Sequence, residues 1–244
     1  MYNIRVHNNR ENNNGSARVL VIIPSYNEES SIRATVNELR EKAPGVDILA
    51  VNDCSTDNTQ GILTELHVKH LRLPINLGIG GAVQAGYKFA DLNGYDVAVQ
   101  LDADGQHDPA YISALIAPIL SGEADLITGS RFIEKEGFQT SGMRRFGIKF
   151  LNGLIRLVCG VKVTDATSGF RAVSRRLIVL YGGEYPTDYP EPEAIVMAKM
   201  NKMKIMEIPV VMRDRLGGQS SIKFFNSVYY MIKVSIAIVL RRLQ

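Results

Sequence analysis

Short apolar runs alternate with segments of helical length through the first half of this sequence. The apolar runs lie at 19–23, 46–51, 95–101 and 124–128. The segments between and after them, long enough for helices, lie at 28–42, 56–68, 80–92 and 109–120. Continuous apolar strands that alternate with helices are typical of a mostly parallel sheet covered on both faces. The pattern therefore predicts an α/β fold.

The second half of the chain departs from this rhythm and is expected to build onto one edge of the sheet. With 244 residues, 45% of them hydrophobic, the chain is long enough for one sizeable core. We expect a disordered tail over 1–17, one α/β domain over 18–221 and an amphipathic helix over 222–244. Further helices are predicted at 143–159 and 191–201, and further strands near 170–173 and 204–212.

Charged residues are distributed unevenly along the chain. Residues 1–130 contain 9 Lys and Arg against 16 Asp and Glu, whereas residues 131–244 contain 19 against 9. An acidic first half suits cation binding and a basic second half suits phosphates or an anionic membrane, although a solvated surface of uneven charge is the simpler alternative. The two cysteines, Cys54 and Cys159, lie far apart in sequence, which favours free thiols in a reducing compartment.

Three of the predicted strands end in polar clusters. The clusters read PSYNEE at 24–29, NDCSTD at 52–57 and DADGQH at 102–107. In open α/β sheets, ligands bind at the carboxyl ends of the strands, so three polar strand ends would meet at one rim. The sequence therefore predicts a ligand site at that rim.

The pair Asp102 and Asp104 is the most specific feature of this rim. Residues i and i+2 of an extended chain point the same way, so the two carboxylates can face one point. Close carboxylates repel each other, and a Mg²⁺ or Mn²⁺ ion, which prefers oxygen ligands, relieves that repulsion. A capped turn is the alternative, because Asp-Gly is a common turn pair and Asp108 is a suitable helix cap.

Seven segments of the chain carry a family resemblance. Four of them resemble the GT-A glycosyltransferases of family two: 21–29, 51–59, 76–86 and 101–109. Three later segments bring the resemblance closer to the dolichyl- and polyprenyl-phosphate sugar synthases: 128–132, 164–171 and 215–223. The resemblance runs from about Arg18 to Lys223. It implies a GT-A fold, which is a Rossmann-like, mostly parallel sheet flanked by helices, here with a C-terminal interfacial helix.

On the donor side, the resemblance implies a nucleoside-diphosphate sugar bound at the first three strand ends. Asn52 stands where these enzymes usually have an acid and Cys54 where glycine is usual, so UDP and GDP both stay open as the nucleotide. Asp102, Asp104 and Gln106 match the site of a Mg²⁺ or Mn²⁺ cofactor. The residues that match the nucleotide site are Pro24, Tyr26, Glu28, Asn52, Asp53, Asn76, Gly81 and Asp102.

On the acceptor side, the resemblance implies a polyprenyl phosphate held by arginines. Arg131 and one of Arg144 and Arg145 match residues that bind the acceptor phosphate, whose geometry suits an arginine fork. Asp165 could take a proton from a hydroxyl acceptor. A polyprenyl phosphate is already an anion near pH 7, and for that acceptor we expect Asp165 to orient other groups. The candidate catalytic residues are thus Asp104, Asp165 and Arg131.

The last part of the chain is strongly basic, with nine Lys and Arg against two acidic residues from Lys199 onward. The glycine-rich loop 213–221 suits a lid over the diphosphate, with Arg215, Ser220 and Lys223 as donors. The segment 224–240 is largely apolar but contains Lys233. This favours a helix that lies in a membrane interface over one that spans the bilayer. A helix docked on the sheet or in a dimer interface is the alternative.

Together these patterns predict a metal-dependent, inverting transfer of a sugar from a nucleoside-diphosphate sugar to a polyprenyl phosphate. No export signal is evident, so we expect a peripheral protein on the cytoplasmic face of a membrane, with no nucleic-acid partner. Assembly into a homo-oligomer is compatible with the sequence. Two alternatives stay open: transfer to a hydroxyl of a growing glycan, with Asp165 as the base, and a catalytically silent scaffold that binds nucleotide sugars.

Overall fold

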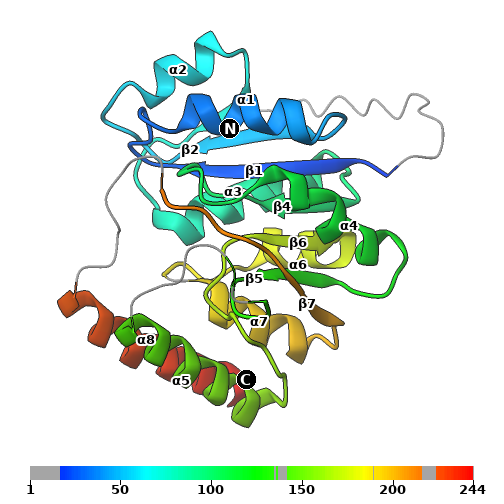
Figure 1. Ribbon diagram of the computed structural model, residues 1–244, viewed down its shortest axis with the longest axis vertical. Coiled ribbons are helices and arrows are strands. Elements are labelled where there is room, and N and C mark those ends of the chain that lie inside the picture. Colours follow the sequence, from blue (N-terminus) through cyan, green and yellow to red (C-terminus); the bar gives the residue numbers. More distant parts are fainter. Residues whose placement is uncertain (1–16, 135, 137–141, 189, 216–223, 244) are drawn as a thin grey trace, which may run out of the picture.

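The computed structural model describes residues 17–134, 136, 142–188, 190–215 and 224–243 (Figure 1). The tail expected over 1–17 therefore lies outside the described residues, except for Ala17. The strands are β1 (Val19–Ser25), β2 (Asp47–Asn52), β3 (Lys69–Arg72), β4 (Val97–Gln100), β5 (Leu126–Ser130), β6 (Arg171–Ser174) and β7 (Ile205–Pro209). The helices are α1 (Ile32–Lys42), α2 (Thr59–Glu65), α3 (Gly78–Leu92), the 3₁₀ helix η1 (Pro109–Tyr111), α4 (Ile112–Leu120), α5 (Gly142–Cys159), α6 (Arg175–Gly183), α7 (Pro190–Met200) and α8 (Phe224–Leu243).

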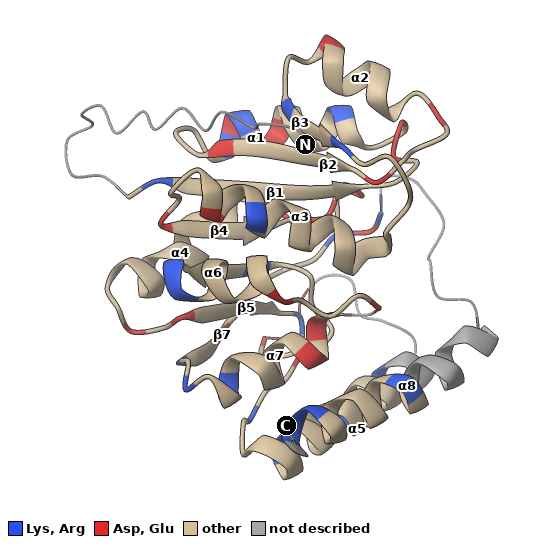
Figure 2. Cartoon of the chain, turned by 180° about the vertical axis from the view of Figure 1, so that it is seen from behind, with Lys and Arg blue, Asp and Glu red and all other residues tan. Residues whose placement is uncertain are grey.

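The seven strands form one sheet in the order β3-β2-β1-β4-β6-β5-β7. Strand β6 runs antiparallel to its neighbours β4 and β5, and the other pairs are parallel. Parallel neighbours require crossover connections, which here are helices that cover the two faces of the sheet. The view from behind shows α3, α6 and α7 over one face (Figure 2). The expected α/β fold with a mostly parallel sheet is confirmed.

The central strands are apolar at nearly every position because both of their faces are buried. In β1, Leu20 and Ile22 belong to the core formed with α3, α5, α6, α7 and α8. Val21 and Ile23 belong to the opposite core, formed with α1, α2 and α4. All four side chains are 0% exposed. A continuous apolar run, which was the sequence signal for these strands, is the direct consequence of this two-sided burial.

Two elements, β3 and α6, are absent from those that the sequence pattern predicts. Strand β3 lies at the edge of the sheet, spans four residues and begins and ends with a basic residue, Lys69 and Arg72. None of its side chains is fully buried, so it contains no apolar run. Helix α6 begins with Arg175 directly after β6, with no polar loop to separate the two elements.

Helix α8 packs against α5 and α7 at the lower end of the molecule in Figure 1. Val234 and Ile238 are buried in the core that these helices share. Within the described ranges, no helix is long and apolar enough to cross a membrane. Ion pairs also hold α8 to its neighbours. Lys233 pairs with Asp188 in the connection between α6 and α7, and Arg241 pairs with Glu184 in the same connection and with Glu193 in α7.

Close packing of α3 on the sheet depends on glycine at one position. A Cβ atom on Gly86 would lie 2.3 Å from Cγ2 of Ile22, which is fully buried in β1. Atoms overlap at that distance, so a larger residue would force the helix or the strand to move.

We predict that Gly86→Ala lowers the free energy of unfolding by about 1–3 kcal/mol, measured by urea denaturation, because the added methyl group overpacks the core. The matched control is Gly153→Ala in α5, where no atom lies within 4 Å of the added Cβ. Alanine has a higher helix propensity than glycine, so the control should raise the free energy of unfolding by about 0.5–1 kcal/mol. Effects of the same sign at both positions would contradict the packing argument.

Candidate active site

The polar clusters after β1 and β2 are joined by hydrogen bonds. Asn27 donates its N–H to Ser55 Oγ at 3.0 Å, and its Oδ1 accepts from the Thr56 N–H at 2.8 Å. The φ angle of Asn27 is 56°, a left-handed conformation that asparagine tolerates. One residue further, the Glu28 N–H donates to Thr59 Oγ1 at 2.8 Å. The two strand ends therefore form one continuous surface.

Asp53 and Asn76, two predicted nucleotide-binding residues, lie together beside the start of α3. Asp53 Oδ1 accepts from the Leu77 N–H at 2.7 Å, and the Asn76 side chain donates to the Asp53 carbonyl at 3.2 Å. A Cβ atom on Gly81 would lie 2.4 Å from Cβ of Leu77. The structure thus brings Asn76 and the start of α3 to the carboxyl end of β2.

Asn52 and Cys54 differ from the residues usual in the resembling enzymes. Asn52 is 1% exposed, and its side chain accepts from the Ser55 N–H at 2.9 Å and donates to Gln60 Oε1 at 2.8 Å. Its polar atoms are thus engaged within the protein. Cys54 has a φ of 62°, in the left-handed region where glycine carries no steric penalty.

The cluster after β1 contributes side chains of different exposure. Pro24 is buried within the strand, whereas the Tyr26 side chain is 48% exposed at the rim. Tyr26 is therefore not part of the packed core. Glu28 is partly buried, and its Oε2 accepts from Ser31 Oγ at 2.6 Å.

The turn after β4 carries the predicted metal ligands Asp102, Asp104 and Gln106. Gly105 has a φ of 78°, which reverses the chain so that the Gln106 N–H donates to Asp104 Oδ1 at 3.0 Å. The capping role considered for Asp108 is also present, because its side chain accepts from the Ala110 N–H. The turn and the acidic pair are thus features of the same segment.

His107 closes this turn and was not among the predicted site residues. Its Nδ1 accepts from the Asp102 N–H at 3.1 Å, and its ring stacks on Phe170 with centroids 4.8 Å apart. Burial lowers the pKa of His107 to about 4, so the ring is neutral at pH 7 and Nδ1 keeps the lone pair that accepts this bond. The sequence offered only one signal, a histidine inside an acidic turn.

Three carboxyl groups lie within electrostatic range of one another at this turn. Burial raises the pKa of Glu28, Asp102 and Asp104, and for Asp104 the negative charge of Asp102 is the next largest cause. In the part of the chain that the structure describes, no three His, Cys, Asp or Glu side chains are arranged to hold a metal. Two carboxylates and an amide oxygen nevertheless fit Mg²⁺ or Mn²⁺, which complete their shells with water and substrate phosphates.

Arg215 supplies positive charge to the same turn. Its Nε lies 3.0 Å from Asp104 Oδ2 and donates to Gln106 Oε1 at 3.1 Å. Gln106 also donates through Nε2 to the Arg213 carbonyl at 3.1 Å, which ties the turn to the segment after β7. The Arg215 guanidinium therefore uses oxygens of two predicted metal ligands. The other predicted lid residues, Ser220 and Lys223, lie outside the described residues.

Arg131 and Asp165, two of the predicted catalytic residues, form a buried ion pair. Arg131 Nε donates to Asp165 Oδ2 at 2.7 Å, and its NH2 group donates to Oδ1 at 2.8 Å. The Arg131 NH2 group also donates to Thr167 Oγ1 at 3.0 Å. Asp165 is 0% exposed and Arg131 is 7% exposed. Both oxygens of Asp165 are thus occupied by the arginine fork.

Phe132 links Arg131 to a second predicted arginine. The guanidinium carbon of Arg131 lies 5.4 Å from the centre of the Phe132 ring, and that of Arg145 lies 5.9 Å from it. Arg144 is part of α5, but its side chain lies outside the described part of the structure. The structure therefore brings Arg131 and Arg145 to one aromatic ring.

The acidic turn and the arginine cluster belong to one electrostatic environment. The charge of Arg131 is among the causes that lower the pKa of Asp102 against the effect of burial. Arg131 and Asp165 both affect the pKa of His107. Glu207 of β7 is a further residue absent from the prediction, and it accepts hydrogen bonds from Thr164 and Asp165.

The mostly parallel sheet and the acidic D-x-D turn after β4 are the features that the GT-A resemblance implies. The sequence profile described as glycosyl transferase family 2 matches residues 20–180. The chain belongs to this family and is a glycosyltransferase.

Three relatives cover most of this chain and of their own length. The chain is 34% identical over 218 residues to the UDP-N-acetylglucosamine–dolichyl-phosphate N-acetylglucosaminyltransferase of Methanococcus voltae, covering 79% of this chain and 84% of the relative. It is 32% identical over 230 residues to the polyprenol monophosphomannose synthase of Mycolicibacterium smegmatis, covering 89% and 86%. It is 33% identical over 221 residues to the undecaprenyl-phosphate mannosyltransferase of Micrococcus luteus, covering 83% and 86%.

A solved structure shares the fold at lower identity. Glucosyl-3-phosphoglycerate synthase from Mycobacterium tuberculosis, crystallised with Mn²⁺, UDP and glucosyl-3-phosphoglycerate, has a TM-score of 0.68 and 20% identity to this chain. The match covers 93% of this chain and 80% of the other.

We predict that Arg215→Met strengthens binding of Mn²⁺ alone by about threefold to tenfold, measured by electron paramagnetic resonance titration without nucleotide. The reason is that Asp104 and Gln106 would no longer be shared with a guanidinium, whose attraction at a partly exposed site is modest. Arg33→Met, which breaks the exposed ion pair with Glu65, is the control and should leave Mn²⁺ binding unchanged. Weaker Mn²⁺ binding in Arg215→Met would contradict competition.

Proposed function

We propose that the protein transfers a sugar from a nucleoside-diphosphate sugar to a polyprenyl phosphate at a membrane surface, with Mg²⁺ or Mn²⁺ as the cofactor. The observation that carries the proposal is the placement of the acidic turn at Asp102 and Asp104 within electrostatic range of the buried Arg131–Asp165 pair. The acidic turn suits a cation that carries a diphosphate, and the arginine of the buried pair suits an anionic acceptor. The names of the relatives, which specify dolichyl, polyprenol and undecaprenyl phosphates, support this acceptor class.

The donor would bind along the carboxyl ends of β1, β2 and β4. One oxygen of Asp53 accepts from the Leu77 N–H, so the carboxylate lies beside the start of α3. A carboxylate there is a suitable acceptor for a nucleobase N–H. Asp102, Asp104 and Gln106 would hold the metal, which when bound neutralises the diphosphate so that it can leave without a proton. Arg215 could then pair with the diphosphate in place of Asp104. The structure of the M. tuberculosis enzyme with Mn²⁺ and UDP supports this use of the fold.

The acceptor phosphate would bind Arg131 and Arg145, with Arg144 as the further candidate. A phosphate monoester is a nucleophile at pH 7 without a base, so its oxygen can attack the anomeric carbon once it is held in line. Asp165 is engaged with Arg131 through both oxygens, which supports an orienting role. Transfer to a hydroxyl would instead need a carboxylate that is open to the acceptor.

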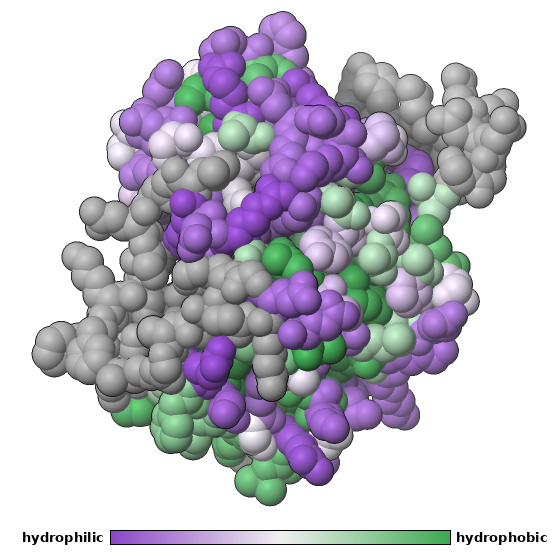
Figure 3. Space-filling view, in the orientation of Figure 1, coloured by the Kyte–Doolittle hydropathy of each residue, from purple (hydrophilic) through white to green (hydrophobic). Residues whose placement is uncertain are grey.

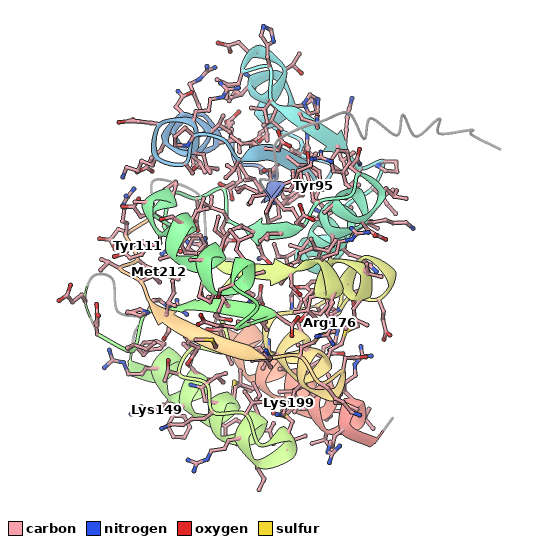
Figure 4. All side chains as sticks on the ribbon, turned by 90° about the vertical axis from the view of Figure 1, so that its right-hand side faces the viewer. Tyr95, Tyr111, Lys149, Arg176, Lys199 and Met212 are labelled. Carbon is pink, nitrogen blue, oxygen red and sulfur yellow. The ribbon has the colours of Figure 1, made fainter. Side chains whose placement is uncertain are left out.

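A membrane-facing surface is proposed on the outer side of α5 and α8. Two stripes of apolar side chains at helical spacing are exposed there: Phe146, Phe150 and Leu157 on α5, and Ile232, Ile236 and Leu240 on α8. Hydrophobic residues lie along this lower edge in Figure 3. Lys149, which projects from α5 at the outer edge of the molecule in Figure 4, is also exposed. Apolar side chains bordered by basic ones suit an anionic bilayer surface, which we place on the cytoplasmic side.

We predict that purified protein with Mn²⁺ moves radiolabelled sugar from a UDP- or GDP-sugar into the organic phase only when a short polyprenyl phosphate is present. Asp104→Asn should lower turnover at least about 10²-fold, the usual scale for loss of one electrostatic contributor to the transition state. The matched control is Asp96→Asn, which removes an acid directly before β4, at the end of the strand away from the acidic turn, and should leave turnover unchanged. Labelling of a glycan hydroxyl but of no lipid phosphate would overturn the acceptor, and donor binding without any transfer would favour the scaffold.

We predict that Phe150→Glu with Ile236→Glu reduces binding to vesicles that contain anionic lipid by at least about tenfold, measured by flotation. Each exposed apolar side chain contributes about 1.5–3 kcal/mol when fully buried, and the new charges would face anionic lipid. Val179→Glu changes an equally exposed apolar residue on α6 and should not alter binding. If the double variant instead turned a dimer into a monomer with unchanged flotation, the surface would be an interface between copies of the chain.

A further inference from the structure

We infer that Glu207 is a positioning residue for the acceptor site, because it fixes the backbone at Thr164 and Asp165 so that Asp165 holds Arg131 in place. This inference rests on the proposed function, since it requires an acceptor phosphate at Arg131. The hydrogen bonds of the Glu207 carboxylate go to Thr164 and Asp165. The effect of Glu207 on Arg131 is transmitted through the residues that lie between them.

The position of Glu207 in the sheet is unusual for an acid. It lies in β7 opposite Thr128 of β5, in a strand whose other residues are Ile205, Met206, Ile208 and Pro209. Its side chain is partly buried, and burial raises the pKa of the carboxyl group. A partly buried acid in an apolar strand is costly unless hydrogen bonds satisfy it, which indicates a specific use.

Glu207 satisfies the backbone of two consecutive residues. Its Oε2 accepts from the Thr164 N–H at 2.7 Å, and its Oε1 accepts from the Asp165 N–H at 2.9 Å. The segment between α5 and β6 has no regular secondary structure at these residues. Both N–H groups would lose their partners if the segment moved, so the carboxylate fixes the direction in which Asp165 leaves the backbone.

A chain of hydroxyl groups leads from Glu207 to the residue after Arg131. The Thr164 hydroxyl donates to Glu207 Oε2 at 2.9 Å, so the 2.6 Å contact between Thr164 Oγ1 and Ser130 Oγ must have Ser130 as the donor. Ser130 Oγ in turn accepts from the Phe132 N–H at 3.2 Å. Every donor in this series of hydrogen bonds is directed toward Glu207, which is the terminal acceptor.

The two routes from Glu207 meet at Arg131. One route runs through Asp165, whose two oxygens accept from Arg131 Nε and the NH2 group at 2.7 and 2.8 Å. The other runs through Thr164 and Ser130 to the backbone on the far side of Arg131. The arginine fork is therefore aligned from its side chain and from its backbone by the same carboxylate.

The loop has a second, independent anchor, so loss of Glu207 need not unfold it. Asn152 of α5 donates to the Thr164 carbonyl at 2.7 Å and accepts from the Ala166 N–H at 3.2 Å. With this anchor in place, removal of the carboxylate should misalign Asp165 and Arg131 without releasing the segment.

The test compares Glu207→Gln with wild type, using farnesyl phosphate as a short polyprenyl phosphate acceptor. The carboxamide keeps the size of the side chain but directs an NH2 group at one of the two backbone N–H donors. We expect the KM for farnesyl phosphate to rise at least about tenfold, while the KM for the nucleotide sugar stays within about twofold. The matched control is Met206→Ala, one residue away on the same strand and 39% exposed, which should change neither KM.

A double-mutant cycle separates positioning from general destabilisation. In an Arg131→Lys background, which already lacks the bidentate fork, Glu207→Gln should raise the KM for farnesyl phosphate less than twofold further. Full additivity of the two substitutions would overturn the inference, as would equal changes in both KM values. If Glu207→Gln does not fold, Thr164→Val removes only the hydroxyl link and should give a smaller rise in the same KM with the same non-additivity.

Wild type distinguishes this inference from the proposed function. If wild type transfers no sugar to farnesyl phosphate or longer polyprenyl phosphates, the proposed function fails and this inference fails with it. If wild type transfers sugar and Glu207→Gln retains the wild-type KM for the acceptor, only the role of Glu207 is refuted.

Discussion

The pairing of buried charge at the carboxyl end of the sheet is the constraint on which the rest of the structure depends. Charges removed from water must be paired or hydrogen-bonded, because an isolated buried ion is highly unfavourable. The acidic turn after β4 comes from the acidic first half of the chain, and Arg131 and Arg215 come from the basic second half. Because β4 lies next to β6, which pairs with β5, the sheet order brings the two halves together. Acidic residues of the first half and basic residues of the second half thus lie together at one site.

Much of the fold could be predicted because the relevant signals are local. Continuous apolar runs identified β1, β2, β4 and β5, since burial on both faces leaves few polar positions in such strands. Asp102 and Asp104 were found because two acids of the same turn are adjacent in sequence. Strand β3 escaped prediction for the same reason, since an edge strand that begins and ends with basic residues carries no apolar signal.

The features that could not be predicted depend on contacts between distant residues. Arg131 and Asp165 are 34 positions apart, and only their placement by the sheet showed that each engages the other. Arg215 meets Asp104 across more than a hundred positions. Glu207 appeared in the sequence as one acid within a predicted strand. The buried side of α8 was likewise hidden, because an apolar stripe fits a bilayer and a neighbouring helix equally well.

The reversed direction of β6 decides which connections can change length without touching the site. Its amino end lies beside the carboxyl end of β4, since Arg171 is opposite Gln100 and Ser174 is opposite Val97. The connection that enters β6 therefore belongs to the rim, while the junction that leaves it for α6 lies at the far edge. Insertions between α5 and β6 would change the rim segment that contains Asp165, the partner of Arg131. Insertions between β6 and α6 would extend the opposite edge. The connections at the two ends of this short strand can therefore change length independently of each other.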